Sequence, residues 1–188
     1  MPLSAAKPRE QFHNRTLDIK GYRRQDGLWD IEGHLRDVKP AAVDRAEPGR
    51  AAGEPIHEMW LRLTIDEMLL IREAEASTER SPYRICPDAA PNFSRLAGIR
   101  IGPGWMRAVR QRVGGVHGCT HLVEMLGQMA TTAMQTLWTV NEAKRVAAPA
   151  DGRHPPPGLL NSCHAYDQSR EVVRERYPAH FKGAAAGE

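Results

Sequence analysis

Cys119 and His121 stand two residues apart in the stretch GCTHL, directly after a glycine and at the start of a segment with helical periodicity. A thiol and an imidazole at this spacing can bind a metal ion, or act as a nucleophile and its base. The same pair can also be a small buried side chain beside a polar one. The pair alone does not decide between these readings, so its partners elsewhere in the chain matter.

His57 and Cys86 are the candidate partners. His57 opens one alternating segment and Cys86 follows the next, so in a hairpin both would lie at the same end of the sheet. A helix packed on that sheet can bring Cys119 to the same place, where the helix N-terminus favours a thiolate. Three N and S ligands from three elements are typical of a catalytic zinc site, with His121 as a fourth ligand or a free base.

The elements that must position these residues begin with strands. The stretch 17–38 predicts a strand or hairpin around an Asp-Gly turn, and one side of its second half carries Trp29, Ile31, Gly33 and Leu35. Residues 40–55 are rich in Ala, Pro, Gly and charge, which predicts an exposed loop.

A second pair of strands is expected after this loop. The apolar residues of the first strand alternate with polar ones, and they are Met59, Leu61, Leu63 and Ile65. Met68–Ala76 is ambiguous between helix and strand, and the short link before it favours a returning strand.

Helices are predicted after Cys86. A short helix or turn covers PDAAPNFSRLAG, a second helix starts near Pro103, and a long one follows GCTHL. The long helix has an apolar stripe made of Leu122, Met125, Leu126, Met129, Ala133, Leu137 and Val140. The stretch DGRHPPPG should end it, and Cys163, expected to be a buried filler, introduces a last amphipathic segment ending near 177–178. Strands followed by helices predict an α+β fold, with helices on one face of a mainly antiparallel sheet.

The length of 188 residues fits a single domain over 1–188. Its expected parts are an N-terminal arm and strands (1–39), a loop (40–55), a metal-binding α+β core (56–145) and a C-terminal segment (146–188). A formal net charge of +3, spread along the chain, excludes a nucleic-acid footprint. Three widely spaced cysteines and the lack of an N-terminal apolar segment favour the cytoplasm, and no apolar run approaches the roughly 20 residues that span a membrane.

One resemblance rests on PIHEMWLRLTIDEMLLIREAEASTERSPYRICPDAAPNFSRLAG followed by GCTHLVEMLGQMA. Over about residues 55–144 this layout resembles the iron–sulfur scaffold proteins of the IscU, SufU and NifU N-terminal kind. The resemblance implies an IscU/SufU-like fold with extra N-terminal strands, and places His57, Cys86 and Cys119 at the three ligand cysteine positions. The carboxylate that follows the first ligand in the scaffolds would fall on Met59. A histidine in place of the first cysteine suits zinc better than a cluster.

A second resemblance covers the whole chain, through GYRRQDGLWDIEGHLRDVK, IHEMWLRLTID and GCTHL in this order. These stretches resemble a family of short bacterial proteins catalogued mainly as a domain of unknown function. Some members accompany genes for the breakdown of lignin-derived aromatics, where formaldehyde-eliminating lyases are needed. The resemblance implies a small-molecule aromatic substrate.

The leading hypothesis is a zinc-dependent lyase that releases formaldehyde by a retro-aldol-like cleavage. The metal would bind the substrate alkoxide while a base takes the hydroxyl proton. His121 is the first candidate base, because the ordinary pKa of histidine lies near neutrality. Glu58, Asp66 and Tyr83 are weaker acid/base candidates, and each also fits a solvated group at a strand end.

The N-terminal arm would contact an anionic aromatic substrate through guanidinium and ring faces. Its candidates are His13, Arg15, Arg23, Arg24 and Trp29, which also fit surface charge and one core tryptophan. Two other functions stay open: an iron–sulfur or sulfur-transfer scaffold that works with a desulfurase and uses Cys119 as a sulfur acceptor, and a structural zinc module that binds protein. A homo-oligomer is also left open.

Overall fold

The computed structural model describes residues 3–44, 46, 48–147 and 160–183. The chain divides into two compact units, Met1–Thr139 and Val140–Glu188, and each is described by itself. This division falls inside the long helix, a few residues before the predicted start of the C-terminal segment at residue 146.

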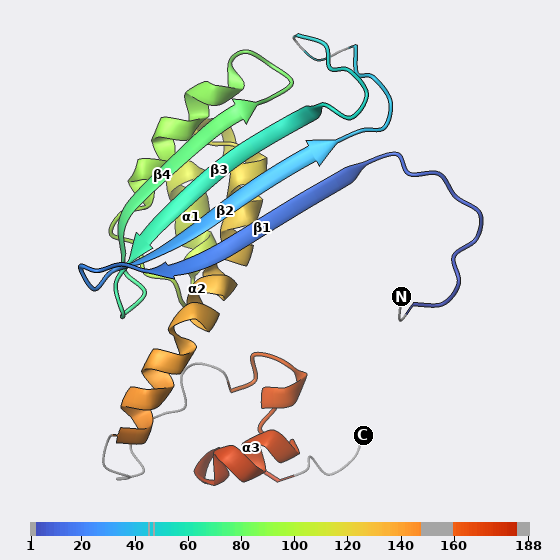
Figure 1. Ribbon diagram of the computed structural model, residues 1–188. Coiled ribbons are helices and arrows are strands. Elements are labelled where there is room, and N and C mark those ends of the chain that lie inside the picture. The colour runs from blue at the N-terminus through green and yellow to red at the C-terminus, as the bar shows by residue number, and fades with distance from the viewer. Residues whose placement is uncertain (1–2, 45, 47, 148–159, 184–188) are drawn as a thin grey trace. The chain divides into compact units, whose positions relative to one another are not determined.

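The first unit is built on four antiparallel strands, which follow one another in space as they do in the chain (Figure 1). They are β1 (Asn14–Arg23), β2 (Trp29–Val38), β3 (Pro55–Ile65) and β4 (Ile71–Arg80). The β1–β2 connection contains Gly27, whose φ of 84° is the left-handed conformation that glycine adopts readily. The predicted hairpins are therefore present.

Each central strand has one apolar face, because its hydrophobic residues recur at every second position. In β2, Trp29, Ile31 and Leu35 are buried, and in β3 the alternating residues from Met59 to Ile65 are buried. The opposite face carries the intervening polar residues. This alternation fixes which face of the sheet receives the helices.

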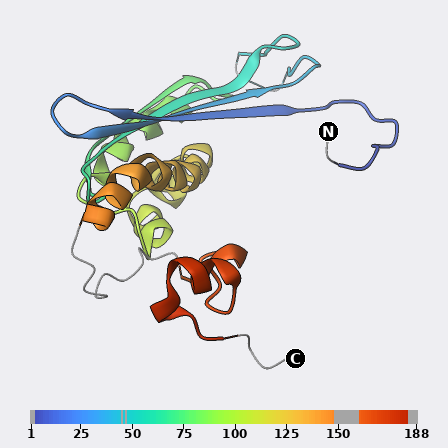
Figure 2. The same ribbon diagram turned by 60° about the horizontal axis from the view of Figure 1, so that its bottom comes forward.

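The helices cover that one face of the sheet (Figure 2). They are η1 (Cys86–Leu96), α1 (Trp105–Val113), η2 (Gly115–His117) and the long α2 (Thr120–Ala147). The predicted stripe of α2 is buried from Leu122 to Leu137. The predicted α+β architecture is confirmed. None of the helices in the described ranges is both long and apolar enough to cross a membrane.

β4 begins later than the predicted returning strand, at Ile71 instead of Met68. The carboxylate of Asp66 accepts hydrogen bonds from the backbone N–H groups of Met68 and Leu70, and Leu69 has a φ of 60°. These residues therefore form a turn, because Asp side chains bond readily to the backbone that follows them.

The second unit contains η3 (His164–Tyr166), α3 (Glu171–Arg176) and η4 (Pro178–His180), in the region of the predicted last amphipathic segment. Val173 and Tyr177 are its buried side chains among the described residues. Cys163 is exposed, which corrects the expectation of a buried filler. The predicted break DGRHPPPG lies outside the described residues.

Candidate functional site

Three polar side chains form a row across one end of the sheet. Arg15 of β1 is the register partner of Asp37 in β2, and Asp37 is the register partner of His57 in β3. Directly opposite residues in antiparallel strands point to the same face. Asp37 continues the inward series of β2, so the row lies on the face that the helices cover.

Asp37 is the centre of this row and is 1% exposed. Its carboxylate accepts two hydrogen bonds from the guanidinium of Arg15, from Nε to Oδ1 and from Nη2 to Oδ2, both of 2.7 Å. His13 Nε2 lies 3.3 Å from Oδ1. Burial raises the pKa of Asp37, but the hydrogen bonds and charge of Arg15, helped by the two histidines, outweigh it and leave the pKa below its ordinary value. The group is therefore a carboxylate at neutral pH.

His57 is oriented by this carboxylate, with Nδ1 3.0 Å from Asp37 Oδ2. Since an ionised carboxylate only accepts hydrogen bonds, Nδ1 donates and Nε2 keeps its lone pair. Burial lowers the pKa of His57, and the nearby His121 lowers it further, against the opposing effect of Asp37. A neutral imidazole with a free Nε2 can take a proton or bind a metal.

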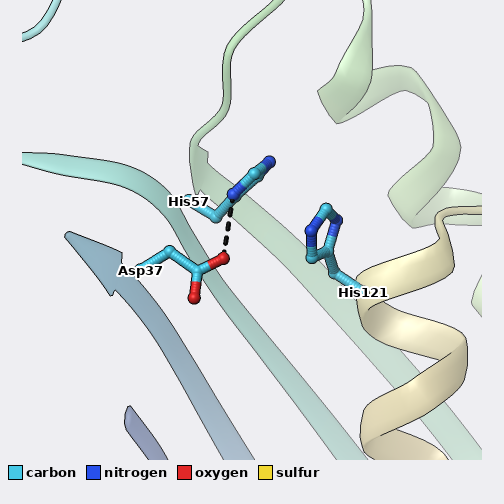
Figure 3. Close-up of side chains that lie close together, drawn as sticks. All are labelled: Asp37, His57 and His121. Carbon is cyan, nitrogen blue, oxygen red and sulfur yellow. Dashed lines mark hydrogen bonds and ion pairs between the residues drawn. The ribbon is translucent and has the colours of Figure 1, made fainter. Parts of the chain in front are cut away.

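His121 faces His57 from the first turn of α2, and the two ring centroids are 4.0 Å apart with an interplanar angle of 36° (Figure 3). Burial lowers the pKa of His121, and the charge of Arg15 lowers it further, whereas Asp37 and Glu124 oppose the shift. The cluster therefore holds two neutral imidazoles in contact, one on the sheet and one on the helix.

This group has the composition of a metal site. In the described part of the chain, Asp37, His57 and His121 are the three side chains whose ligand atoms lie within 4.8 Å of one another. Neutral imidazoles and a carboxylate suit zinc. Because Arg15 already bonds to both oxygens of Asp37, this carboxylate fits best behind His57, as the hydrogen-bonded group that fixes a metal-binding histidine. His57 and His121 are then the residues that fit a metal directly.

Cys119 lies next to His121 but is not part of the Asp37–His57–His121 group. Its Sγ lies 3.8 Å from His121 Nδ1 and 4.0 Å from Met59 Sδ. Sulfur and nitrogen ligands of one tetrahedral zinc lie about 3.6 Å apart, as zinc–ligand distances of about 2.3 and 2.1 Å require. Cys86, at the start of η1, is also outside the group. The structure thus assembles Asp37 and His121 around His57, in place of the two predicted thiols.

The weaker acid/base candidates lie elsewhere. Glu58 is on the opposite face of β3, where its carboxylate lies 3.2 Å from His34 Nε2. Asp66 is engaged in the β3–β4 turn and pairs with Arg72. Tyr83 follows β4 and is 56% exposed. The structure does not bring any of the three into the Asp37–His57–His121 group.

The substrate-binding candidates separate into two places. His13 and Arg15 lie beside Asp37, and the guanidinium of Arg15 is hydrogen-bonded to its carboxylate. Arg24 lies beyond the other end of β1, about 30 Å along an extended strand, and pairs with aspartates there. Trp29 is a buried core residue at that end, with Arg23 5.6 Å from its ring centroid. Arg24 and Trp29 therefore do not share a site with Arg15.

Sequence reasoning did not identify Asp37, although a signal was present. It stands two residues after Leu35, next in the series Trp29, Ile31, Gly33, Leu35 that predicts the buried face. An acid on a buried face requires a charged or hydrogen-bonding partner, because a lone buried carboxylate is costly. The pattern therefore pointed to a buried ion pair near the end of β2.

The comparisons with known proteins concern the unit that carries the cluster. Residues 13–135 match the model of a family described as "Protein of unknown function (DUF2889)". No curated protein and no solved structure matches the chain. The matched segment contains His13, Arg15, Asp37, His57 and His121, and covers more than half of the chain. The chain therefore belongs to the DUF2889 family.

Proposed function

We propose that the protein is a lyase that cleaves a carbon–carbon bond in a hydroxymethyl-bearing, lignin-derived aromatic and releases formaldehyde. The supporting observation is the ionised Asp37, which is fixed by Arg15 and orients neutral His57 beside neutral His121. The choice of substrate draws on the resemblance of the whole chain to proteins that accompany aromatic breakdown. The choice of reaction draws on what the imidazole pair can do.

The required step is a proton transfer coupled to bond cleavage. An imidazole accepts the O–H proton of the hydroxymethyl group. The C–O single bond then becomes the C=O bond of formaldehyde, and the C–C bond breaks. Its electron pair passes to the aromatic fragment, which must delocalise it or expel a leaving group. His57 suits the accepting role because its Nδ1–H is held by Asp37 and its Nε2 is unprotonated.

The same donor set fits zinc, held by His57 and His121, with Cys119 next to His121. Bound zinc would supply Lewis-acid stabilisation of the developing alkoxide, and the hydroxyl proton would pass to solvent because both imidazoles would be ligands. Asp37 would then fix the ring of the ligand His57 and increase its basicity. With or without zinc, the Arg15–Asp37–His57 row fixes the direction in which His57 Nε2 points.

An assay of formaldehyde release from a panel of hydroxymethyl-bearing aromatic dimers tests the reaction. His57→Gln and Asp37→Asn should lose most of the activity, while Glu58→Gln, on the opposite face, should retain it. Lack of release across the panel by the folded wild-type protein would contradict the lyase.

Elemental analysis after purification without oxygen tests the metal. One zinc per chain that is lost in His57→Gln supports the zinc form, and activity that survives chelation supports direct proton transfer. Acid-labile sulfide with a visible absorption band would instead favour the iron–sulfur scaffold. Zinc that binds tightly without any turnover would favour the structural module.

A further inference from the structure

β1 is a long, regular sheet edge without a partner on its outer side. Its ten residues pair in unbroken register with β2, and no other strand of the described chain pairs with it. Nine of the ten are exposed and Ile19 is half-buried. The opposite edge differs, because Ile71 of β4 exchanges backbone hydrogen bonds with Gly98 and Ile99. Unpaired edges of this length are templates for another strand.

The centre of β1, LDIKG, is self-complementary in charge. Within one chain, Lys20 Nζ already lies 2.5 Å from Asp18 Oδ2. In an antiparallel pair of two copies centred on Ile19, Asp18 of each copy also stands opposite Lys20 of the other, so the four charges alternate in sign. Moving the centre by one residue would place Asp18 opposite Asp18, or Lys20 opposite Lys20. Opposite charges on facing residues stabilise a strand pair and like charges destabilise it. Charge therefore selects the register centred on Ile19.

The other facing residues in this register are compatible with it. Leu17 of one copy stands opposite Gly21 of the other, which has no side chain of its own and is covered on this face by Thr136 of α2. Arg15 would face Arg23, but each guanidinium already has a partner in its own chain. Arg15 bonds to Asp37, and Arg23 lies over the ring of Trp29.

The geometry points to a homodimer in which β1 pairs antiparallel with β1 of a second copy, around a twofold axis at Ile19. The two sheets become one continuous sheet, with the helices of both copies on the same face. The backbone N–H and C=O groups on the outer edge of β1 supply the hydrogen bonds, and the two Asp18–Lys20 pairs set the register. The inference is independent of the proposed reaction.

A charge-swap series measured by sedimentation across a wide range of concentrations tests the interface. The wild-type protein should sediment with twice the mass of one chain. Asp18→Lys places like charges opposite each other twice and should weaken association by about tenfold or more. Lys20→Asp should do the same. The double variant Asp18→Lys/Lys20→Asp restores complementarity and should dimerise like the wild type.

Crosslinking tests the register. In a Cys163→Ser background, Ile19→Cys places two thiols opposite each other at the axis, within the Cα separations that disulfides accept, and oxidation should give a covalent dimer. Leu17→Cys is the matched control, because its thiol faces Gly21 of the second copy, and oxidation should not give a covalent dimer. A wild-type protein that sediments as a monomer, a double swap that fails to recover, or equal crosslinking at both positions would each overturn the proposal. Circular dichroism must first show that every variant is folded.

Discussion

Asp37 and His57 face each other across β2 and β3, with 3.0 Å between Asp37 Oδ2 and His57 Nδ1, at the point where the strand register shifts between Asp37 and Val38. Both side chains stand on strands, so the backbone ladder sets their relative position. The ring of His57 is therefore oriented by the sheet, and His121 depends on how α2 packs against it.

Removing the charge of Asp37 should affect the cluster and the fold together. Asp37→Asn keeps the shape, but it deprives Arg15 of its ionic partner and allows the opposite tautomer of His57. We expect the free energy of unfolding to fall by about 2 kcal/mol, a typical loss for a broken hydrogen bond to a buried charged group. Urea denaturation measures this loss. Glu75→Gln, on a 75% exposed side chain, should change stability by less than about 0.5 kcal/mol.

Acid should destabilise the metal-free protein in two stages. His57 and His121 have pKa values lowered from 6.5, so just below pH 6.5 the unfolded chain binds protons that the native chain does not. Stability is therefore complete above that pH and is lost as the pH falls toward the native pKa values. Asp37, with a pKa lowered from 3.8, adds a second loss below about that pH.

Thermal unfolding after chelation, followed as a function of pH, checks the first stage. His57→Gln removes one titrating group. The slope of the unfolding free energy against pH should therefore fall by up to about 1.4 kcal/mol per pH unit. A slope that is unchanged in both His57→Gln and His121→Gln would contradict the lowered pKa values.

Gly33 lies under two methionine side chains of α2. A Cβ atom at this position would lie 2.8 Å from Met125 Sδ and 3.1 Å from Met129 Sδ. Gly33→Ala should cost at most about 1 kcal/mol of stability, the low end of overpacking effects, because the flexible Met125 and Met129 side chains can shift to make room. Gly102→Ala, with open space around the new atom, is the matched control. Calorimetry measures the difference, and a loss well above about 1 kcal/mol would show that the methionines cannot shift.

Zinc titrations should separate the two cysteines. Cys86→Ser should bind zinc as tightly as the wild type, because Cys86 is outside the three-residue cluster. Cys119→Ser should bind it less tightly, because its sulfur lies 3.8 Å from His121 Nδ1. His57→Gln should lose at least about tenfold in affinity, within the range seen for groups that support a metal site. Equal losses in Cys86→Ser and His57→Gln would restore the predicted three-element site.

The fold was predictable because its signals are local. Alternation in 56–65 and helical spacing after residue 119 specify which faces are buried, and strands before helices specify the layers. The start of β4 was less predictable. Met68 and Leu70 have the composition of a strand, but the side chain of Asp66 binds their N–H groups and holds them in a turn.

The site was only partly predictable, because it depends on register. His57 and His121 were recognised as chemistry-bearing residues, and the structure brings them together. Asp37 is 20 residues before His57, and its role depends on which residues of β2 and β3 stand opposite each other. Local spacing does not encode that pairing. The prediction that Cys86 lies beside His57 assumed that both residues stand at one end of a hairpin. The few residues between the end of β4 and Cys86 are enough to separate the two side chains.

The contact between the His57 and His121 rings joins segments 64 residues apart in the chain, one from the sheet and one from the long helix. A folding intermediate with a formed sheet and an undocked helix would contain the Arg15–Asp37–His57 row but lack the second imidazole. The ring of His57 therefore reports helix docking, since its NMR shift would register the contact with His121 separately from the formation of the sheet.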